Sequence, residues 1–405
     1  MVIIGKWQDH PVTLSVKPNC LTLSLERDGS AQVFSFDFAG RMWTALMEGI
    51  SYRRGLDGKI VAKWQTGPGE RERRWLTGEH ARQIEARARE AAAGLYAAIE
   101  NGQAKLQSPL PELGRLGFER AADFDTERTQ ADIRRYHQVY KPVGILPPDQ
   151  YMAVVLQATE GCAFNTCTFC DFYRDRRFRI KSEQEFLQHA QAVRDFVGEG
   201  LSLRRTVFLG DANALIAPMP KLVPLMETVH RVYDVEALGG IFAFLDGFSA
   251  EKKTPQDYKT LAGLGLERVY VGMESGNPGL LKFLKKPGKP EDAIHAVQSM
   301  KAAGVAVGVI VLLGAGGQMF VKEHVRDTIK AINAMRLDMN DIIYFSELIT
   351  SEGMQYVQDA YQSQLNPLKP QERIAQGEAI ERGLKFSRRG GTPHISRYDI
   401  REFVY

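Results

Sequence analysis

The sequence is poor in cysteine, and three of its cysteines lie close together. The chain of 405 residues has four: Cys162, Cys167 and Cys170 form one group, and Cys20 stands alone far upstream. A small secreted protein held by disulfides spreads an even set of cysteines along its chain. This distribution excludes a disulfide framework, and three clustered thiols in a reducing compartment indicate a metal site.

Long apolar runs are also missing, and so is a strong charge of either sign. No stretch is apolar over the length needed to cross a bilayer, and the first residues contain Lys6 and Asp9 instead of the apolar core of a signal peptide. The formal net charge is +3, whereas a nucleic-acid-binding protein usually presents a concentrated basic face. We therefore expect a cytoplasmic protein whose partner is neither a membrane nor a nucleic acid; its oligomeric state is open.

The first part of the chain predicts an α+β domain. Alternating apolar and polar residues at 31–38 and 42–46 predict a small antiparallel meander. An Ala-, Glu- and Arg-rich segment with apolar residues at helical spacing predicts a helix over 79–100, and a second helix is expected near 128–140. We expect residues 1–150 to form a separate domain of unknown role.

From residue 151 onward, strand patterns alternate with helix patterns, which is the signature of a parallel sheet. Strands are predicted at 152–157, 206–209, 240–245, 268–272, 306–313 and 342–347. Helices are predicted between them at 183–197, 219–232, 255–264, 290–303 and 321–335. The fold class is therefore α/β, with a partial (β/α)6 TIM-like barrel over 151–348 whose functional groups gather at the C-terminal ends of the strands. Residues 349–405 are expected to form a C-terminal helical extension.

The three clustered cysteines directly follow the first predicted barrel strand, in the segment E-G-C-A-F-N-T-C-T-F-C. Iron–sulfur clusters bind Cys thiolates, and a [4Fe-4S] cube needs four ligands, so three cysteines leave one iron for an external ligand. Structural zinc also uses Cys-x2-Cys pairs, but a second Cys or His pair at finger spacing is absent, and His189 and His230 are isolated on predicted helices. Cys20 lies in an alternating stretch that indicates a buried structural thiol.

This loop resembles that of the radical S-adenosylmethionine (SAM) superfamily, in which an aromatic residue, here Phe169, precedes the third cysteine. The spacing is Cys-x4-Cys-x2-Cys, one residue longer than the usual Cys-x3-Cys-x2-Cys. The resemblance covers about residues 151–348 and implies a [4Fe-4S] cluster on Cys162, Cys167 and Cys170, with SAM on the free iron. The implied reaction is reductive cleavage of SAM to a 5′-deoxyadenosyl radical, which abstracts hydrogen from an unidentified small-molecule substrate. A one-electron donor such as flavodoxin or ferredoxin would supply the electron.

Two strand ends resemble segments with which the family binds SAM. Gly210-Asp211-Ala212 stands after the second strand in place of the family's Gly-Gly-Glu, which implies that Gly210 and Asp211 receive the SAM amino group. The alternative for Asp211 is a helix N-cap. The fourth strand ends in G-M-E-S-G, similar to the family's Gly-x-Glu-Ser-Gly, which implies that Glu274 and Ser275 face the ribose or methionine end of SAM. The alternative is a buried structural carboxylate.

The fifth strand, at 306–313, resembles the family's apolar strand that contacts adenine. The resemblance implies contacts from Ile310, Leu312 and Gly314, although an apolar strand is also ordinary core. In the basic run after the cysteines, Arg179 and Lys181 are candidates to meet the SAM carboxylate, an acidic substrate or an electron donor, but charge runs are usually solvated.

Two functions of other kinds stay open at this point. The first is a haem or cofactor carrier that keeps the radical SAM fold without turning over a substrate. The second is a zinc-stapled binding module. Beyond Cys20 no cysteine remains for a second cluster, and a catalytic residue acting after hydrogen abstraction is not identified.

Overall fold

The computed structural model describes residues 1–27, 29–67, 70–248 and 253–405. The chain divides into two compact units. Unit 1 comprises Met1–Val143, Gln191–Arg205 and Arg401–Tyr405, and unit 2 comprises Gly144–Ala190 and Thr206–Ile400. The predicted division of the chain into three domains stays a prediction.

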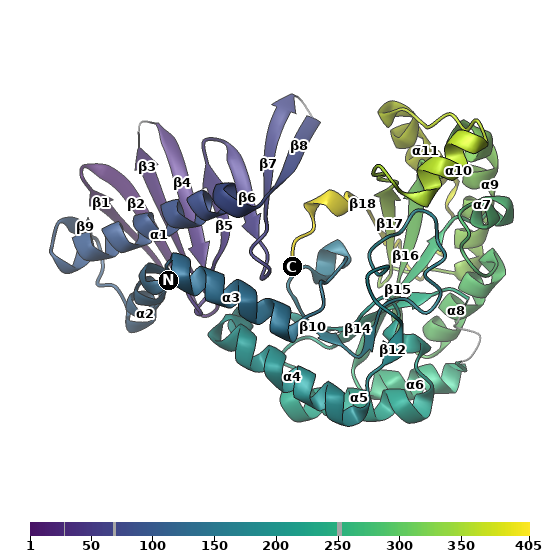
Figure 1. The fold of residues 1–405 in the computed structure, drawn as a ribbon, viewed down its shortest axis with the longest axis horizontal. Coiled ribbons are helices and arrows are strands. Elements are labelled where there is room, and N and C mark those ends of the chain that lie inside the picture. The colour runs from purple at the N-terminus through teal and green to yellow at the C-terminus, as the bar shows by residue number, and fades with distance from the viewer. Residues whose placement is uncertain (28, 68–69, 249–252) are drawn as a thin grey trace. The chain divides into compact units, whose positions relative to one another are not determined.

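Unit 1 is built on a nine-stranded sheet with the order β8-β7-β6-β5-β4-β3-β2-β1-β9 (Figure 1). Every neighbouring pair is antiparallel, so the predicted meander is confirmed. The observed meander has more strands than the alternating patterns at 31–38 and 42–46 predict. The strands are β1 (Val2–Trp7), β2 (His10–Lys17), β3 (Cys20–Arg27), β4 (Ser30–Phe36), β5 (Met42–Met47), β6 (Ile50–Arg54), β7 (Ile60–Gly67), β8 (Glu70–Leu76) and β9 (Ala104–Leu106).

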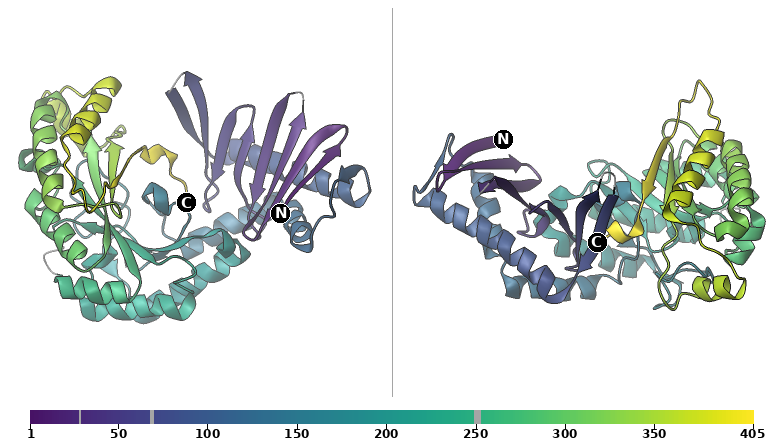
Figure 2. Two further views of the ribbon diagram at one scale, coloured as in Figure 1. Left: turned by 180° about the vertical axis from the view of Figure 1, so that it is seen from behind. Right: turned by 90° about the horizontal axis from the view of Figure 1, so that it is seen from above.

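Helix α1 (Gly78–Glu100) lies along one face of this sheet (Figure 2). Its buried residues are Ala81, Ala88, Ala92, Leu95 and Ala98. They share a core with sheet residues such as Leu14 and Phe34, because their spacing puts them on one side of the helix. Helices α2 (Glu112–Asp123) and α3 (Thr126–Val139) follow. The helices predicted at 79–100 and near 128–140 are thus present.

Unit 2 is built on a seven-stranded parallel sheet with the order β10-β13-β14-β15-β16-β17-β18. The strands are β10 (Ala153–Gln157), β13 (Thr206–Gly210), β14 (Ile241–Asp246), β15 (Leu266–Glu274), β16 (Ala306–Leu313), β17 (Ile342–Glu347) and β18 (His394–Tyr398). The first six confirm the predicted strands to within a few residues. Strand β10 is buried at every residue and is apolar except for its last residue, Gln157, because both faces of a parallel sheet are covered.

The seventh strand differs from the sequence analysis, which expected the tail to be a helical extension. The tail does contain α10 (Gln355–Gln362) and α11 (Pro370–Gly383), but β18 follows them and pairs in parallel with β17. Residues up to Ile400 therefore group with the barrel sheet. A short strand at a sheet edge forms because a neighbouring strand offers it hydrogen bonds. The local sequence pattern does not show that this neighbour is present.

Helices connect the parallel strands and cover the outer side of the curved sheet (Figure 1). They are α4 (Glu183–Val197), α5 (Met219–Val232), α6 (Pro255–Gly263), α7 (Pro278–Phe283), α8 (Pro290–Ala302) and α9 (Gly317–Met335). Two short strands, β11 (Thr159–Glu160) and β12 (Arg179–Ile180), pair antiparallel at the base of the cysteine loop. In the part of the chain that the structure describes, no helix is long and apolar enough to cross a membrane.

Candidate active site

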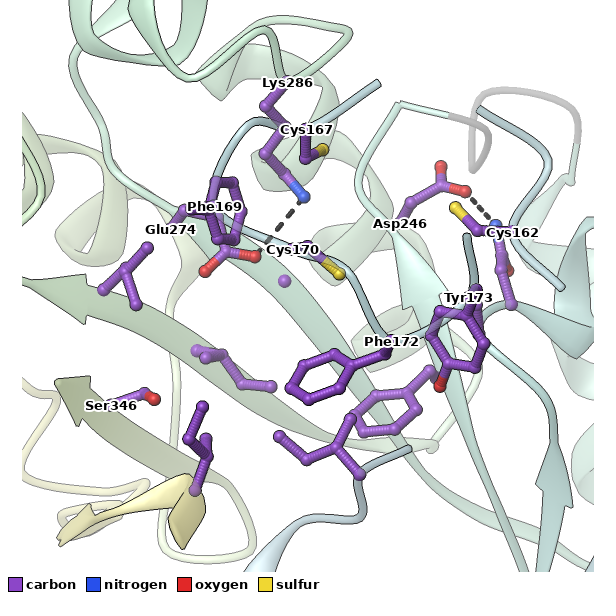
Figure 3. A pocket seen from close by; sticks show the side chains of 18 of the residues that line it. Cys162, Cys167, Phe169, Cys170, Phe172, Tyr173, Asp246, Glu274, Lys286 and Ser346 are labelled. Atoms are coloured by element: carbon purple, nitrogen blue, oxygen red, sulfur yellow. Dashed lines mark hydrogen bonds and ion pairs between the residues drawn. The ribbon is translucent and has the colours of Figure 1, made fainter. Parts of the chain in front are cut away.

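The C-terminal ends of the unit 2 strands surround a hollow of about 200 Å³ (Figure 3). Its wall combines Ile145, the loop after β10, residues at or near the ends of β13 to β18, and Lys286, which follows α7. Parallel strands bring these ends to one edge of the sheet, so residues that are far apart in sequence meet here. This is the edge at which the sequence analysis expects functional groups.

Cys162, Cys167 and Cys170 all line the hollow. Their loop has its own hydrogen bonds: the Arg174 guanidinium donates to the carbonyl oxygens of Cys167 at 2.9 Å and of Cys170 at 3.1 Å. The Asn165 N–H donates to Sγ of Cys162 at 3.4 Å. The three predicted metal ligands are thus brought together on an ordered loop. Cys20 is buried in strand β3, as expected of a structural thiol.

Burial raises the pKa of two of these thiols. The pKa of Cys170 rises to about 12, and that of Cys167 also rises. A cysteine ligates metal as the thiolate, so both favour the protonated form until a cationic group offsets the burial. Among the described residues, no three Cys, His, Asp or Glu side chains converge closely enough to hold a single metal ion.

Glu274 and Lys286 form a buried ion pair in the wall of the hollow. Nζ of Lys286 lies 3.4 Å from Oε1 of Glu274, as the dashed line in Figure 3 shows. Burial opposes the charge of Lys286, but the carboxylate of Glu274 and the thiol of Cys167 raise its pKa above the ordinary value. Glu274 also has φ +61°, an uncommon conformation for a residue other than glycine that often marks a functional site. The structure thus places Glu274 where the sequence analysis expects it and adds Lys286, which that analysis missed.

A second carboxylate, that of Asp246 at the end of β14, also lines the hollow. It accepts a hydrogen bond from Nδ2 of Asn213, which follows β13 and lines the hollow as well. The sequence analysis missed both residues. Their position in the sequence could have identified them as candidates, because each polar side chain stands at or just after the end of a predicted barrel strand.

Asp211 does not line the hollow, although the resemblance implies that it receives the SAM amino group. It is 5% exposed, and its oxygens accept from the Gly161 N–H at 3.2 Å, from Arg176 at 3.0 Å and from Gln157 at 3.3 Å. Burial raises its pKa, and the charge of Arg176 opposes that rise. Gly210, the last residue of β13, is also absent from the wall. Asp211 therefore bonds to both ends of the cysteine loop, and its contact with SAM stays a prediction.

Ser275 points away from the hollow toward helix α9. Its hydroxyl lies 2.7 Å from Nδ1 of the fully buried His324, and the neighbouring Gly276 N–H donates to Oγ1 of Thr328 at 3.0 Å. Both contacts fix the turn that begins at Glu274. Ser275 thus supports the turn from behind, and the structure brings Glu274 but not Ser275 to the hollow.

Of the three predicted adenine contacts, two line the hollow and one does not. Ile310 and Leu312 line the hollow, as does Phe169 from the cysteine loop. Gly314 lies outside the lining, and its N–H donates to Oε1 of Gln376 at 2.8 Å. Strand β18 adds Tyr398 to the wall, which the sequence analysis missed because it did not predict that strand.

In the basic run after the cysteines, the two candidates Arg179 and Lys181 are engaged in ion pairs. Arg179 contacts Glu160 at 2.9 Å and Glu185 at 2.7 Å. Nζ of Lys181 contacts Glu160 at 3.3 Å and donates to the carbonyl oxygen of Gln157 at 2.7 Å. Neither side chain lines the hollow, so both stabilise the base of the cysteine loop.

These features define a partial-barrel protein with three thiols, a lysine and the carboxylates of Asp246, Glu274 and Glu347 around one hollow. Residues 156–332 match the family model of the radical SAM superfamily. The match identifies a radical SAM domain over these residues, which supports an enzyme. No curated protein matches it in sequence.

Several solved structures resemble this chain weakly. Methylornithine synthase (PylB) is 12% identical with TM-score 0.39, over 60% of this chain and 71% of that chain. Coproporphyrinogen III oxidase (HemN) from Escherichia coli is 14% identical with TM-score 0.39, over 58% of this chain and 55% of that chain, so just over half of that enzyme is spanned. Streptococcus suis SuiB bound to S-adenosylmethionine is 10% identical with TM-score 0.40, over 87% of this chain and 72% of that chain. These values are too low to carry any property of those proteins over to this chain.

Proposed function

We propose that the hollow in unit 2 binds one [4Fe-4S] cluster on Cys162, Cys167 and Cys170, together with SAM, and that the enzyme acts on a small-molecule substrate. The observation that carries this proposal is the joint presence of the three thiols and the Glu274–Lys286 pair in one wall. A cluster with three protein ligands keeps one iron open, and the neighbouring charged groups are suited to the ligand that reaches it.

The spread of the thiols fits a cluster better than zinc. A zinc ion draws its thiolates to about 2.3 Å from one point, whereas a cube distributes three thiolates over three iron atoms. In the described residues the thiols share a wall without converging on one point. The positive charge of a bound centre would also offset the burial that raises the pKa of Cys167 and Cys170.

The charges around the hollow fit the amino-acid end of SAM. An α-amino acid carries an ammonium and a carboxylate, and here the charges of Glu274 and Asp246 both act on Lys286. We assign the SAM carboxylate to Lys286 and the ammonium to Glu274 or Asp246, because charge-assisted hydrogen bonds are the strong ones. Phe169, Ile310 and Leu312 supply an apolar surface for the adenine ring.

Cluster and SAM together supply a 5′-deoxyadenosyl radical for hydrogen abstraction, with the electron from a flavodoxin- or ferredoxin-like donor. The chain orients the bound groups and excludes water. Phe172, Leu348 and Ile349 line the hollow with apolar surface, which keeps competing hydrogen donors out of the site.

The test is anaerobic reconstitution of the full chain, followed by iron and sulfide analysis and by measurement of 5′-deoxyadenosine formed from SAM with dithionite. We expect a brown protein with about four iron atoms per chain and deoxyadenosine that depends on reductant. A colourless protein holding one zinc and no iron would identify a zinc-stapled module. Haem transfer with a bound cluster but no deoxyadenosine would identify a carrier.

A further inference from the structure

Asp211 holds both ends of the loop that carries the three cysteines. At one end the Gly161 N–H donates to Oδ2 of Asp211 at 3.2 Å. At the other end the Arg176 guanidinium donates to the same oxygen at 3.0 Å. All three cysteines lie between Gly161 and Arg176 in the sequence. One carboxylate therefore closes the loop where the chain enters and leaves it.

Asp211 is also fixed to the strand that leads into the loop. Its other oxygen, Oδ1, accepts from Nε2 of Gln157 at 3.3 Å, and its own N–H donates to Oγ1 of Thr159 at 3.1 Å. The side chains of Asp211 and Arg176 are 2% and 7% exposed. Removing the carboxylate would take away the acceptor of Nη1 of Arg176 and of the Gly161 N–H, and loss of such an acceptor is costly in a protein interior.

The chain passes close to itself at this point. Gly161 has φ +75°, and a Cβ atom on it would lie 3.2 Å from Cγ and 3.2 Å from the carbonyl oxygen of Arg176. Glycine permits this approach, and Asp211 supplies the charge that holds it. The Arg176 guanidinium lies 5.8 Å from the ring centroid of Tyr173, which lines the hollow with the cysteines. Asp211 is thus linked through Arg176 to Tyr173, which lines the hollow beside the thiols.

We propose that Asp211 is a positioning residue for the metal centre, which holds the cysteine loop in its ligating conformation and makes no contact with SAM. This inference rests on the proposed function, because it requires a cluster on the three cysteines. Residues that orient metal ligands without touching the metal set how tightly it is held. Loss of Asp211 therefore acts on the cluster, whereas loss of Glu274 acts on SAM.

The experiment compares the full-length wild-type chain with its Asp211→Asn, Asp211→Ala and Asp175→Asn variants, each reconstituted anaerobically. Asp175 is the matched control: it also contacts Arg176, at 2.9 Å, but its side chain is 56% exposed. Transfer of iron to a strong chelator is timed, the EPR spectrum of the reduced cluster is recorded, and SAM affinity is measured.

We expect iron to leave Asp211→Ala about ten times faster or more, the usual scale for loss of a group that orients metal ligands. Asp211→Asn keeps one acceptor oxygen, so its rate of iron release should lie between those of Asp211→Ala and wild type. Asp175→Asn should release iron at the wild-type rate. The EPR spectrum should change in both Asp211 variants, because the cluster then sits in a less uniform loop. Unchanged iron release and spectrum, together with weaker SAM binding, would make Asp211 a SAM ligand and overturn the inference.

Thermal unfolding shows whether Asp211→Ala folds. If its thermal transition is lost, a second variant tests the inference. Arg176→Met removes the cation and keeps the apolar stem. Faster iron release from it supports the inference, and wild-type release overturns it. Failure of the wild-type chain to take up iron would overturn the proposed function, and this inference with it.

Discussion

Both units bury an ion pair, but the pairs differ in how fully they are bonded. In unit 1 the Arg41 guanidinium donates to both carboxylate oxygens of Asp132, at 2.7 and 2.9 Å. It also donates to the carbonyl oxygens of Phe196 at 2.8 Å and Val197 at 3.0 Å. All three guanidinium nitrogens of Arg41 thus donate hydrogen bonds.

In unit 2 the Glu274–Lys286 pair spans 3.4 Å and faces a hollow. Its carboxylate and ammonium keep capacity for further hydrogen bonds, which a ligand with both charges can use. The difference shows that burial of charge does not identify a functional site. A pair closed by the backbone stabilises the fold, and a loosely bonded pair at a cavity is available for binding.

The largest expected effect falls on the thiols of unit 2. Replacement of Cys162, Cys167 or Cys170 by Ala should abolish retention of the cluster, about four iron atoms per chain, because a cube with two protein ligands is poorly held. Iron analysis after anaerobic reconstitution measures this. Cys20→Ala is the control and should bind iron like wild type; equal loss in Cys20→Ala would show that the ligand set is wrong.

The closed pair in unit 1 should matter for stability alone. Arg41→Met leaves the buried Asp132 carboxylate with the more distant Arg54 guanidinium, at 3.8 Å, and should lower the free energy of unfolding by about 3 kcal/mol. Urea or thermal unfolding measures this. The exposed Arg128–Asp123 pair, at 3.4 Å, is the control, and Arg128→Met should cost less than about 1 kcal/mol. If Arg41→Met unfolds like wild type but loses SAM binding, the distinction between the two pairs fails.

The open pair should matter for binding. Glu274→Gln keeps the shape of the side chain and removes its charge, so SAM affinity should fall by about 1.5–3 kcal/mol while the cluster stays. Calorimetric titration of the reconstituted protein measures this. Glu267→Gln, at an exposed position of the same strand, should leave the affinity unchanged. Wild-type affinity in Glu274→Gln would remove Glu274 from the SAM site.

The smallest effect is a pH dependence of stability from His324. Burial lowers its pKa from 6.5 to about 4, so below pH 6.5 the unfolded chain takes up a proton that the folded chain does not. Stability should therefore fall as the pH drops from 6.5 toward 4, by about 2 kcal/mol between pH 7 and pH 5. Urea unfolding of wild type and His324→Gln at both pH values isolates this contribution, which the variant should lack. An equal pH dependence in both proteins would contradict it.

The sequence by itself determined the periodic elements and the position of the cysteine loop. Six of the seven parallel strands, the long helix α1 and the cysteine loop all carry local patterns, because apolar spacing and cysteine spacing are properties of short segments. Glu274 was found in the same way, from a motif at a strand end. These features are fixed by residues near one another in the chain.

The tertiary structure alone decided which polar groups face the hollow. Asp211 and Ser275 stand at the expected strand ends, yet one bonds to the cysteine loop and the other lies against His324. Lys286 and Asp246 meet at the hollow from different connections of the sheet. Strand β18 forms because the edge of β17 offers it hydrogen bonds. Side-chain direction at a strand end depends on partners that are distant in sequence, and a local pattern does not contain them.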